Sequence, residues 1–578
     1  MAKSINRRNF VQGAALSAAA LGGMSLVGCT GSSSGAGSAD DDAADSASDE
    51  EELYGTELTG PEAEPIEPVA VPEEWDYEAD IIWVGSGGAG NVGPWKAASD
   101  GLSVIVLEKN SSTGGTSQET NIFSVSGTKY QVEQGYDEFD LATALTSQAS
   151  LQGLGTKMNT PLLSAFLPRV PECADWMYDN GVQWEIESEC YGIEGLCWEG
   201  SEAGGFEVRA SKVTLDYCKE QAESLGVEYK TSTPATALVQ DDDGRVVGVQ
   251  AEDEDGNVIY LKGEKAVVLS AGGMEHNKDL LAKYCPTALK CLTTTANTGN
   301  TGDGIRMGLG VGAAMAGYDT FMGFDGGMDW NGTWSHYLYS GDVQLVRQPW
   351  LGLNKQGERY PYWSLSDYTG FAATMAGSTL LSQPEGHGYV FWDADFETNI
   401  VDFEEYMCRR PITPELADDG ADLDRLPESI GPHDYMEGVE KALEAGVIKQ
   451  ADTLEELAEL LDFDPDILVA QVEAWNEICE AGVDSLYGYK EKWLKPIQNA
   501  PFYGAAVGST ILSTASGLKW NGNMQVVGTD GNVIPGLYTA GCNAGGLAGT
   551  TNNGLSGSGV MQSCAGGYVA ACYIAENE

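Results

Sequence analysis

A glycine-rich hexapeptide directly after an apolar run offers the clearest chemistry in the sequence. The apolar run covers residues 79–84, and residues 85–90 read GSGGAG. At this spacing Gly85 allows a tight turn, Gly87 lets backbone approach a pyrophosphate, and Gly90 lets a helix pack on the strand. The N-terminus of that helix would offer N–H groups and a positive dipole end to the phosphates. The predicted contacts of this turn with a dinucleotide come from Gly85, Gly87, Gly88, Ala89 and Gly90.

A strand, a helix and a second strand must hold this turn in place. Residues 91–100 suit a helix, and residues 103–107 form a second apolar strand that ends at Glu108. A carboxylate at that point is placed to accept a hydrogen bond from a ribose hydroxyl. Residues 113–117, which read TGGTS, add a second glycine-rich loop that is characteristic of FAD proteins rather than NAD proteins. The sequence therefore predicts FAD, with further contacts from Glu108, Lys109, Gly115, Thr116 and Ser117.

The first 29 residues predict a twin-arginine export signal rather than folded structure. Arg7 and Arg8 precede an apolar run at 14–27 that is too short to cross a bilayer. The residues before Cys29 resemble a lipobox, which favours a lipid-anchored N-terminus over an ordinary cleavage site beside an incidental cysteine. We expect the protein at the outer face of the cytoplasmic membrane or in the periplasm or cell envelope, attached by that anchor only. Residues 30–75 are acidic and low in periodic apolar residues, which predicts a disordered linker.

Charge and cysteine spacing exclude several classes of partner. The net charge is −56, from 31 basic and 87 acidic residues, so nucleic acid is excluded as a partner. The 12 cysteines include no CxxC pair. Their scatter argues against haem c, zinc and iron–sulfur sites, and no metal site is expected.

The later part of the chain repeats the glycine pattern in a specific order. A β-meander with a turn at 243–245 leads to a buried strand at 266–270. Residues 269–277 (LSAGGMEHN), 300–304 (NTGDG), 535–542 (PGLYTAGC) and 554–559 (GLSGSG) follow. With the two earlier loops, this order resembles the fumarate reductase/succinate dehydrogenase flavoprotein superfamily. More narrowly, it resembles the branch of soluble fumarate reductases, urocanate reductases and 3-ketosteroid dehydrogenases.

The resemblance implies an α/β fold, a Rossmann-like FAD-binding domain with an inserted α+β capping domain. The FAD-binding domain would comprise residues 76–319 and 514–578, and the capping domain residues 320–513. The C-terminal helix would point its N-terminus at the flavin pyrimidine ring. Cys542 stands where many relatives carry a glutamate that contacts FAD. Further implied FAD contacts are Ala235, Asp303, Cys542, Ser558 and Gly559.

The resemblance also implies hydride exchange between flavin N5 and a C=C bond, with a proton from the cap. However, the residues that grip a dicarboxylate in the family have changed here. Phe324 and Ser513 replace two histidines, and Asp367 and Asn552 fall where arginines are expected, with Gly554 as the alternative to Asn552. Losing this cationic clamp predicts an enzyme that is not specific for fumarate.

Aromatic, hydroxyl and acidic groups stand in place of the clamp. Ketosteroid dehydrogenases use tyrosines as acid and polariser, so Tyr368 is the first candidate acid/base. Asp367, if buried and protonated, is the second. Candidate substrate contacts are Tyr360, Phe324, His336, Ser513 and Asn552, each weighed against an ordinary packing or surface role.

Three functions are compatible with these residues. The leading one is an exported, respiratory ene-reductase acting on a neutral, aromatic or weakly anionic small molecule. Its electrons would come from a separate cytochrome or flavoprotein. A 3-ketosteroid-type dehydrogenase would run the same chemistry in the opposite direction. A flavin electron carrier without C=C chemistry is the minor alternative.

Overall fold

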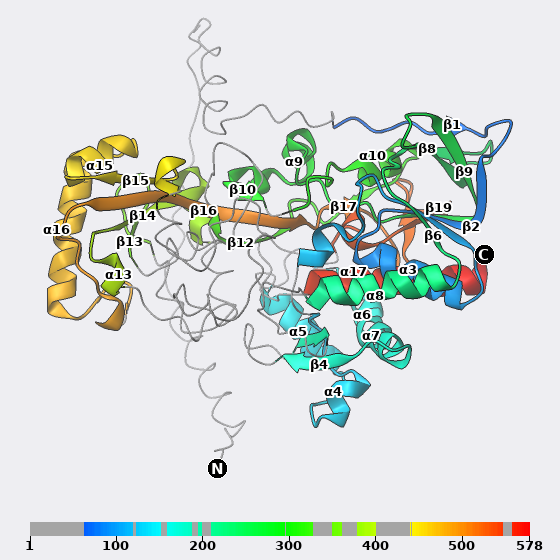
Figure 1. Ribbon diagram of the computed structural model, residues 1–578, viewed down its shortest axis with the longest axis horizontal. Coiled ribbons are helices and arrows are strands. Elements are labelled where there is room, and N and C mark those ends of the chain that lie inside the picture. Colours follow the sequence, from blue (N-terminus) through cyan, green and yellow to red (C-terminus); the bar gives the residue numbers. More distant parts are fainter. Residues whose placement is uncertain are drawn as a thin grey trace, which may run out of the picture. The chain divides into compact units, whose positions relative to one another are not determined.

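Figure 1 shows the protein as a computed structural model. It describes residues 63–119, 123–151, 159–187, 195–198, 210–294, 296–327, 350–360, 379–399, 440, 442–489, 491–546 and 558–578. The described elements form a nine-stranded main sheet with helices on it and a six-stranded second sheet.

The centre of the main sheet is a run of parallel strands. In spatial order they are β6 (Glu228–Lys230), β3 (Val104–Leu107), β2 (Tyr77–Val84), β9 (Val258–Leu269) and β19 (Val533–Thr539). Ile82 of β2 pairs with Ile105 on one side and Val267 on the other. β18 (Gln525–Val527) continues the sheet beyond β19 in antiparallel fashion.

Both faces of this parallel core are buried, which explains its nearly continuous apolar strands. Ile81 and Trp83 face a core shared with α3 (Gly88–Ser99), α8 (Ala210–Ser224) and α17 (Ser558–Asn577). Ile82 and Val84 face the opposite core, which includes residues of α9 (Lys278–Tyr284) and α10 (Asp303–Gly310). The predicted α/β fold class is confirmed.

An antiparallel meander extends the sheet on one side. β7 (Ala235–Gln240) and β8 (Val246–Glu252) pair with each other, and β8 pairs with the first half of β9. Gly244, in the predicted turn between them, has a φ of 82°. That left-handed conformation suits glycine, because the Cβ of any other residue would come too close to its own backbone carbonyl.

The folded chain begins earlier than the sequence indicated. Residues 63–75 were assigned to the disordered linker, yet β1 (Val69–Ala70) pairs in parallel with β7. The backbone N–H of Ile66 donates to the carbonyl of Arg306 at 3.0 Å, and the side chain of Arg306 donates to the carbonyl of Glu64 at 2.8 Å. The acidic composition of this segment gave no pattern that predicts structure, because its few apolar side chains gain a packing partner only once α10 has formed.

Shorter elements complete the FAD-binding part. They are η1 (Gly115–Glu119), α4 (Lys129–Glu133), α5 (Leu141–Leu151), α6 (Thr160–Phe166), α7 (Arg169–Asp179), β4 (Trp184–Glu187), β5 (Gly195–Trp198), η2 (Pro286–Lys290), β11 (Met315–Ala316), β17 (Gly517–Leu518) and η7 (Gly541–Asn543). β4 pairs antiparallel with β5, and α7 packs on α17.

The second sheet is organised around β16 (Phe502–Thr514), whose 13 residues pair with four other strands. Those strands are β10 (Thr293–Thr294), β12 (Phe321–Gly327), β14 (His387–Trp392) and β15 (Ile448–Ala451); β13 (Leu351–Leu353) pairs with β14. In Figure 1, β16 is the long brown and orange strand that continues from β15 to β12.

A separate hydrophobic core lies under this sheet. α15 (Leu454–Leu460) and α16 (Pro465–Ala481) pack on each other, and α13 (Phe396–Asn399), η3 (Pro384–Gly386) and η6 (Glu491–Trp493) are shorter. The buried core residues run from Trp350 to Val507, inside the segment predicted as the capping domain. We call the elements of this core the cap; its predicted boundaries at 320 and 513 stay a prediction.

Candidate active site

The glycine turn lies between the end of β2 and the start of α3. Gly85 has a φ of 96°, and its N–H donates to the carbonyl of Leu107 at 2.7 Å. α3 begins at Gly88, inside the motif rather than at residue 91 as predicted, with Gly87 as its N-cap. A Cβ on Gly90 would overlap the carbonyl oxygen of Gly85. The third glycine therefore serves the close packing of helix on turn that the spacing predicted.

Glu108 organises the adjoining loop from the end of β3. Its Oε2 accepts hydrogen bonds from the N–H of Ser86 at 3.1 Å and the hydroxyl of Ser86 at 2.6 Å. Its Oε1 accepts from the N–H of Asn110 at 2.9 Å. A carboxylate has about four acceptor positions. These three bonds fix the carboxylate and leave room for the ribose hydroxyl that the sequence assigned to it.

The second glycine loop is tied to the first. The N–H of Gly114 donates to the carbonyl of Ser86 at 3.0 Å, and the N–H of Gly88 donates to the hydroxyl of Ser117 at 3.0 Å. Thr116 faces the other way, and its hydroxyl accepts from the N–H of Asn297 at 2.9 Å and the amide of Asn300 at 3.2 Å. The loop thereby connects the glycine turn to residues 297–300.

Lys109 and Asp303 form an ion pair between Nζ and Oδ2 at 2.6 Å, and Lys109 also donates to the hydroxyl of Thr301 at 2.7 Å. Asp303 is the first residue of α10. A carboxylate in the first helical turn also interacts favourably with the helix dipole. The pair joins the strand that carries Glu108 to the NTGDG segment.

The loops that follow β9 and β19 form the remaining wall of this site. Asn543 accepts from the N–H of Ala271 at 2.6 Å and donates to the carbonyl of Gly272 at 2.8 Å. Cys542 lies beside it, and its side chain hydrogen-bonds that of Ser513. Burial raises the pKa of the Cys542 thiol to about 12, with a further contribution from the charge of Glu275. Cys542 is therefore a neutral thiol and cannot replace the carboxylate that relatives carry.

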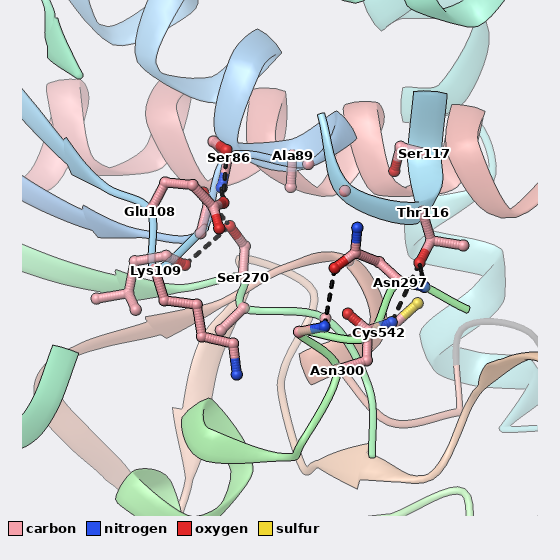
Figure 2. Close-up of a pocket in the computed structure, with 18 of the residues that line it drawn as sticks. Ser86, Ala89, Glu108, Lys109, Thr116, Ser117, Ser270, Asn297, Asn300 and Cys542 are labelled. Atoms are coloured by element: carbon pink, nitrogen blue, oxygen red, sulfur yellow. Dashed lines mark hydrogen bonds between the residues drawn. The ribbon is translucent and has the colours of Figure 1, made fainter. Parts of the chain in front are cut away.

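One pocket brings most of the predicted cofactor contacts together (Figure 2). Its lining includes Gly85, Gly87, Gly88, Ala89, Glu108, Lys109, Gly115, Thr116, Ser117, Ala235, Asp303 and Cys542. Gly90 lies behind the turn, and Gly559 packs beside Met322 in the first turn of α17, which starts at Ser558.

Several residues that line the pocket had no role predicted from the sequence. Ser270, Asn297 and Ser563 line the pocket without any assigned role, and Asn300 lay in a noted motif but was not assigned. Asn297 carries no local signal, because its contact with Thr116 joins positions 181 residues apart.

The predicted catalytic and substrate residues are placed only in part. Tyr368, Asp367, His336 and Asn552 lie outside the described residues. Phe324 is on β12, where its backbone pairs with Thr510, and Ser513 is on β16, 5% exposed and beside Cys542. Tyr360 is 3% exposed within the cap core and packs against Gly352 and Gly388, so its placement favours a packing role over substrate contact.

The residues present fit FAD. A Cβ on Gly88 would approach the hydroxyl of Ser117 and the sulfur of Cys564 at 3.3 Å each, which is tighter than usual, so glycine suits this position in the lining of the pocket. Gly87 and Gly88 would hold the pyrophosphate, Glu108 the ribose, and Thr116 with Asn300 the flavin side of the pocket. A doubly wound sheet with this turn and second loop defines a dinucleotide-binding flavoprotein.

Residues 80–560 match the sequence profile of the FAD binding domain family, and the chain belongs to that family. A vinyl phenol reductase from Lactiplantibacillus plantarum is 27% identical over 481 residues, or 82% of this chain and 91% of that protein. A digoxin reductase from Eggerthella lenta is 27% identical over 571 residues, or 94% and 92%. The open conformation of a flavocytochrome c3 fumarate reductase has a TM-score of 0.63 at 21% identity, over 87% of this chain and 79% of that chain.

These relatives confirm the fumarate reductase/succinate dehydrogenase flavoprotein superfamily and FAD as the cofactor. The chain is an FAD-dependent oxidoreductase of the group acting on C=C and CH–CH bonds, in which both reductases and dehydrogenases occur. When bound, FAD supplies the hydride chemistry, and the protein supplies orientation, proton delivery and electrostatics.

Proposed function

We propose that this chain reduces the activated C=C bond of a neutral, aromatic or weakly anionic substrate, as an ene-reductase that is not specific for fumarate. One observation carries the proposal. Ser513, in place of a histidine of the family's dicarboxylate grip, is buried beside Cys542 at the wall of the FAD pocket.

The names of two of the relatives support the same substrate class, whereas two others are named for fumarate. Vinyl phenol and digoxin reductases each take their name from a compound that is not a dicarboxylate. A relative named 3-oxosteroid 1-dehydrogenase, 24% identical over 86% of this chain, keeps the ketosteroid-type dehydrogenase as the second candidate.

Anaerobic reoxidation of the reduced flavin by candidate acceptors tests the substrate class. The panel holds vinyl phenols, aryl acrylates, urocanate, 3-keto-enone steroids and fumarate. Losing even two of the four charge-assisted contacts of the clamp amounts to about 3 kcal/mol, so we expect fumarate to react at least about 100-fold more slowly than the best acceptor. Stopped-flow absorbance of the flavin gives each rate.

Fumarate reacting as fast as the best acceptor would refute this proposal. Bleaching of the oxidised enzyme by saturated ketosteroids, with no reoxidation by any alkene, would favour the dehydrogenase. Electron exchange with redox dyes and no response to any substrate would favour the carrier.

Tyr368 is proposed as the proton donor, with Asp367 as the second candidate. General acid catalysis contributes about 100- to 10,000-fold, so Tyr368→Phe should lower kcat by about 100-fold or more while the FAD content is retained. Tyr260→Phe, on β9 in the meander, is the matched control and should keep kcat. An unchanged kcat in Tyr368→Phe would remove this tyrosine from the mechanism.

We also propose that the protein is exported, anchored by a lipid at Cys29, and reduced by a separate cytochrome or flavoprotein. In the part of the chain that the structure describes, no helix is both long and apolar enough to cross a membrane. Cell fractionation tests the anchor: Cys29→Ala should move the protein from the membrane to the soluble envelope fraction. Retention of that variant on the membrane would contradict lipid attachment.

A further inference from the structure

Glu275 is a fully buried carboxyl group that joins a loop of the FAD pocket to β16. It follows the pocket-lining residues Ala271 and Gly272 at the end of β9 and is 0% exposed. Its Oε1 accepts hydrogen bonds from both the N–H and the hydroxyl of Thr514, the latter at 2.9 Å. The same hydroxyl accepts from the N–H of Met274 at 3.0 Å. The last residue of β16 is thus bonded directly to this carboxyl.

Two further contacts connect Glu275 with the wall of the pocket. Asn300, which lines the pocket, hydrogen-bonds the Glu275 carboxyl and donates to the hydroxyl of Thr116 at 3.2 Å (Figure 2). The charge of Glu275 also raises the pKa of Cys542, another lining residue. A charge change in the pocket must therefore be felt at Glu275, because buried charges interact strongly in a medium of low dielectric.

The titratable groups around Glu275 are mostly neutral. Cys542 faces it from η7 and Cys285 from the end of α9, and burial raises the pKa of both thiols. His276 turns to the carbonyl of Ala296 at 3.1 Å, and burial lowers its pKa. Lys109 and Asp303 line the pocket as a pair, and Asp319 lies near Cys285. Glu108 and Asp303 line the pocket themselves, but Glu108 is held by the N–H groups of Ser86 and Asn110 and Asp303 by Lys109, whereas Glu275 is the carboxyl of this group that is 0% exposed.

Burial is the largest influence on this carboxyl, and it raises the pKa of Glu275 despite the hydrogen bonds from Thr514 and Asn300. Desolvation disfavours the charged form of a carboxyl group. An additional negative charge in the pocket raises the pKa of a carboxyl further. Both effects favour binding of a proton by Glu275 when the pocket becomes more negative.

We propose that Glu275 takes up a proton from solvent when FAD in the adjoining pocket is reduced. Two electrons enter from an external reductant such as dithionite, and one proton goes to flavin N5. A second proton forms an O–H bond on the Glu275 carboxylate, which offsets the added negative charge. The inference rests on the FAD site alone and stands whichever substrate is reduced.

The midpoint potential of the bound FAD as a function of pH tests this. One proton per two electrons gives about 30 mV per pH unit and two protons give about 59 mV. We expect the steeper slope in the pH range between two pKa values of Glu275, the lower one with oxidised FAD and the higher one with reduced FAD. Below both pKa values Glu275 is protonated in both redox states, and above both it is deprotonated in both. In these two pH ranges it therefore contributes nothing to the slope of the midpoint potential. Glu275→Gln should remove the steep segment.

Proton uptake by the protein from a weakly buffered solution and the infrared difference spectrum give independent readouts. Reduction of the wild type should produce a protonated carboxyl band that Glu275→Gln lacks. Asp393→Asn is the matched control: Asp393 is 3% exposed in the cap and accepts from the N–H groups of Gln498 and Asn499 at 2.7 and 2.9 Å. This variant should keep the steep segment.

A steep segment that survives in Glu275→Gln would come from the flavin itself and would overturn the proposal. If that variant does not retain FAD, the slope and the carboxyl band of the wild type decide. A wild-type slope of about 30 mV per pH unit throughout, without the carboxyl band, would equally overturn it.

Discussion

Gly90→Ala is expected to weaken the binding of FAD by up to about 100-fold. The added Cβ would overlap the backbone carbonyl of Gly85, which has little freedom to move because Gly85 already has a φ of 96° and bonds Leu107. Either α3 shifts away from the turn or the turn opens, and both displace Ser86 and Gly87 from the pocket. Overpacking of this kind costs about 1–3 kcal/mol, and at the upper end that corresponds to a Kd for FAD raised about 100-fold.

The ratio of flavin to protein absorbance after purification measures this, with FAD titration of the apoprotein as the quantitative form. Gly522→Ala is the control, because a Cβ there would only touch Ala165 at 3.6 Å. Gly87→Ala distinguishes the role of the motif in helix packing from its role in pyrophosphate binding. Its Cβ meets only Ser117 and Gly114, at 3.5 and 3.9 Å. That variant should fold normally and lose FAD only through contact with the pyrophosphate. A Kd for FAD in Gly90→Ala equal to that of the wild type would contradict the predicted clash.

Arg359→Met should destabilise the cap by about 3–5 kcal/mol, because it leaves Asp484 as an unpaired buried charge. The guanidinium Nη2 donates to Oδ2 of Asp484 at 2.7 Å, and the two side chains are 8% and 0% exposed. The guanidinium also lies 4.9 Å from the ring of Trp475, 5.0 Å from Tyr487 and 5.5 Å from Tyr489. Both the ion pair and these cation–π contacts are lost in the variant.

Chemical denaturation followed by tryptophan fluorescence gives the free energy of unfolding. The double variant Arg359→Met/Asp484→Leu should recover much of the loss, because a buried ion pair replaced by apolar groups is often neutral or stabilising. A double variant as unstable as Arg359→Met would show that the loss of free energy of unfolding comes from packing around the arginine rather than from the unpaired charge.

At acidic pH the free energies of unfolding of the wild type and of Arg359→Met should become more similar. Burial alone would raise the pKa of Asp484, but the hydrogen bond from Arg359 and the N–H groups of Tyr487 and Leu486 lower it below its usual 3.8. A depressed pKa in the folded state stabilises the fold above the unfolded value. That stability is lost as the pH falls through the folded value. The difference in the free energy of unfolding should therefore shrink as the pH falls through the pKa of Asp484 in the variant, which is higher without Arg359, and then through the lowered pKa in the wild type.

Local rules predicted the nucleotide turn well. Gly85, Gly87, Gly90 and Glu108 lie within one strand–helix–strand unit, where short-range backbone geometry fixes each role. The start of α3 was placed three residues late, at 91 rather than 88, because glycine is a poor helix former and its use at a helix N-terminus depends on the partner it approaches. Tyr360 was interpreted as a substrate contact, although the cap packs it between Gly352 and Gly388.

The sequence by itself determined the α/β class, FAD as the cofactor and about half of the residues that line the pocket. These depend on glycine spacing and on strands that are apolar on both faces. Only the tertiary structure decided that Glu275 meets Thr514 across 239 positions, and that Arg359 meets Asp484 across 125. A buried charge leaves no local pattern of its own. Its partner is chosen by which distant segments the folded core brings within hydrogen-bonding distance.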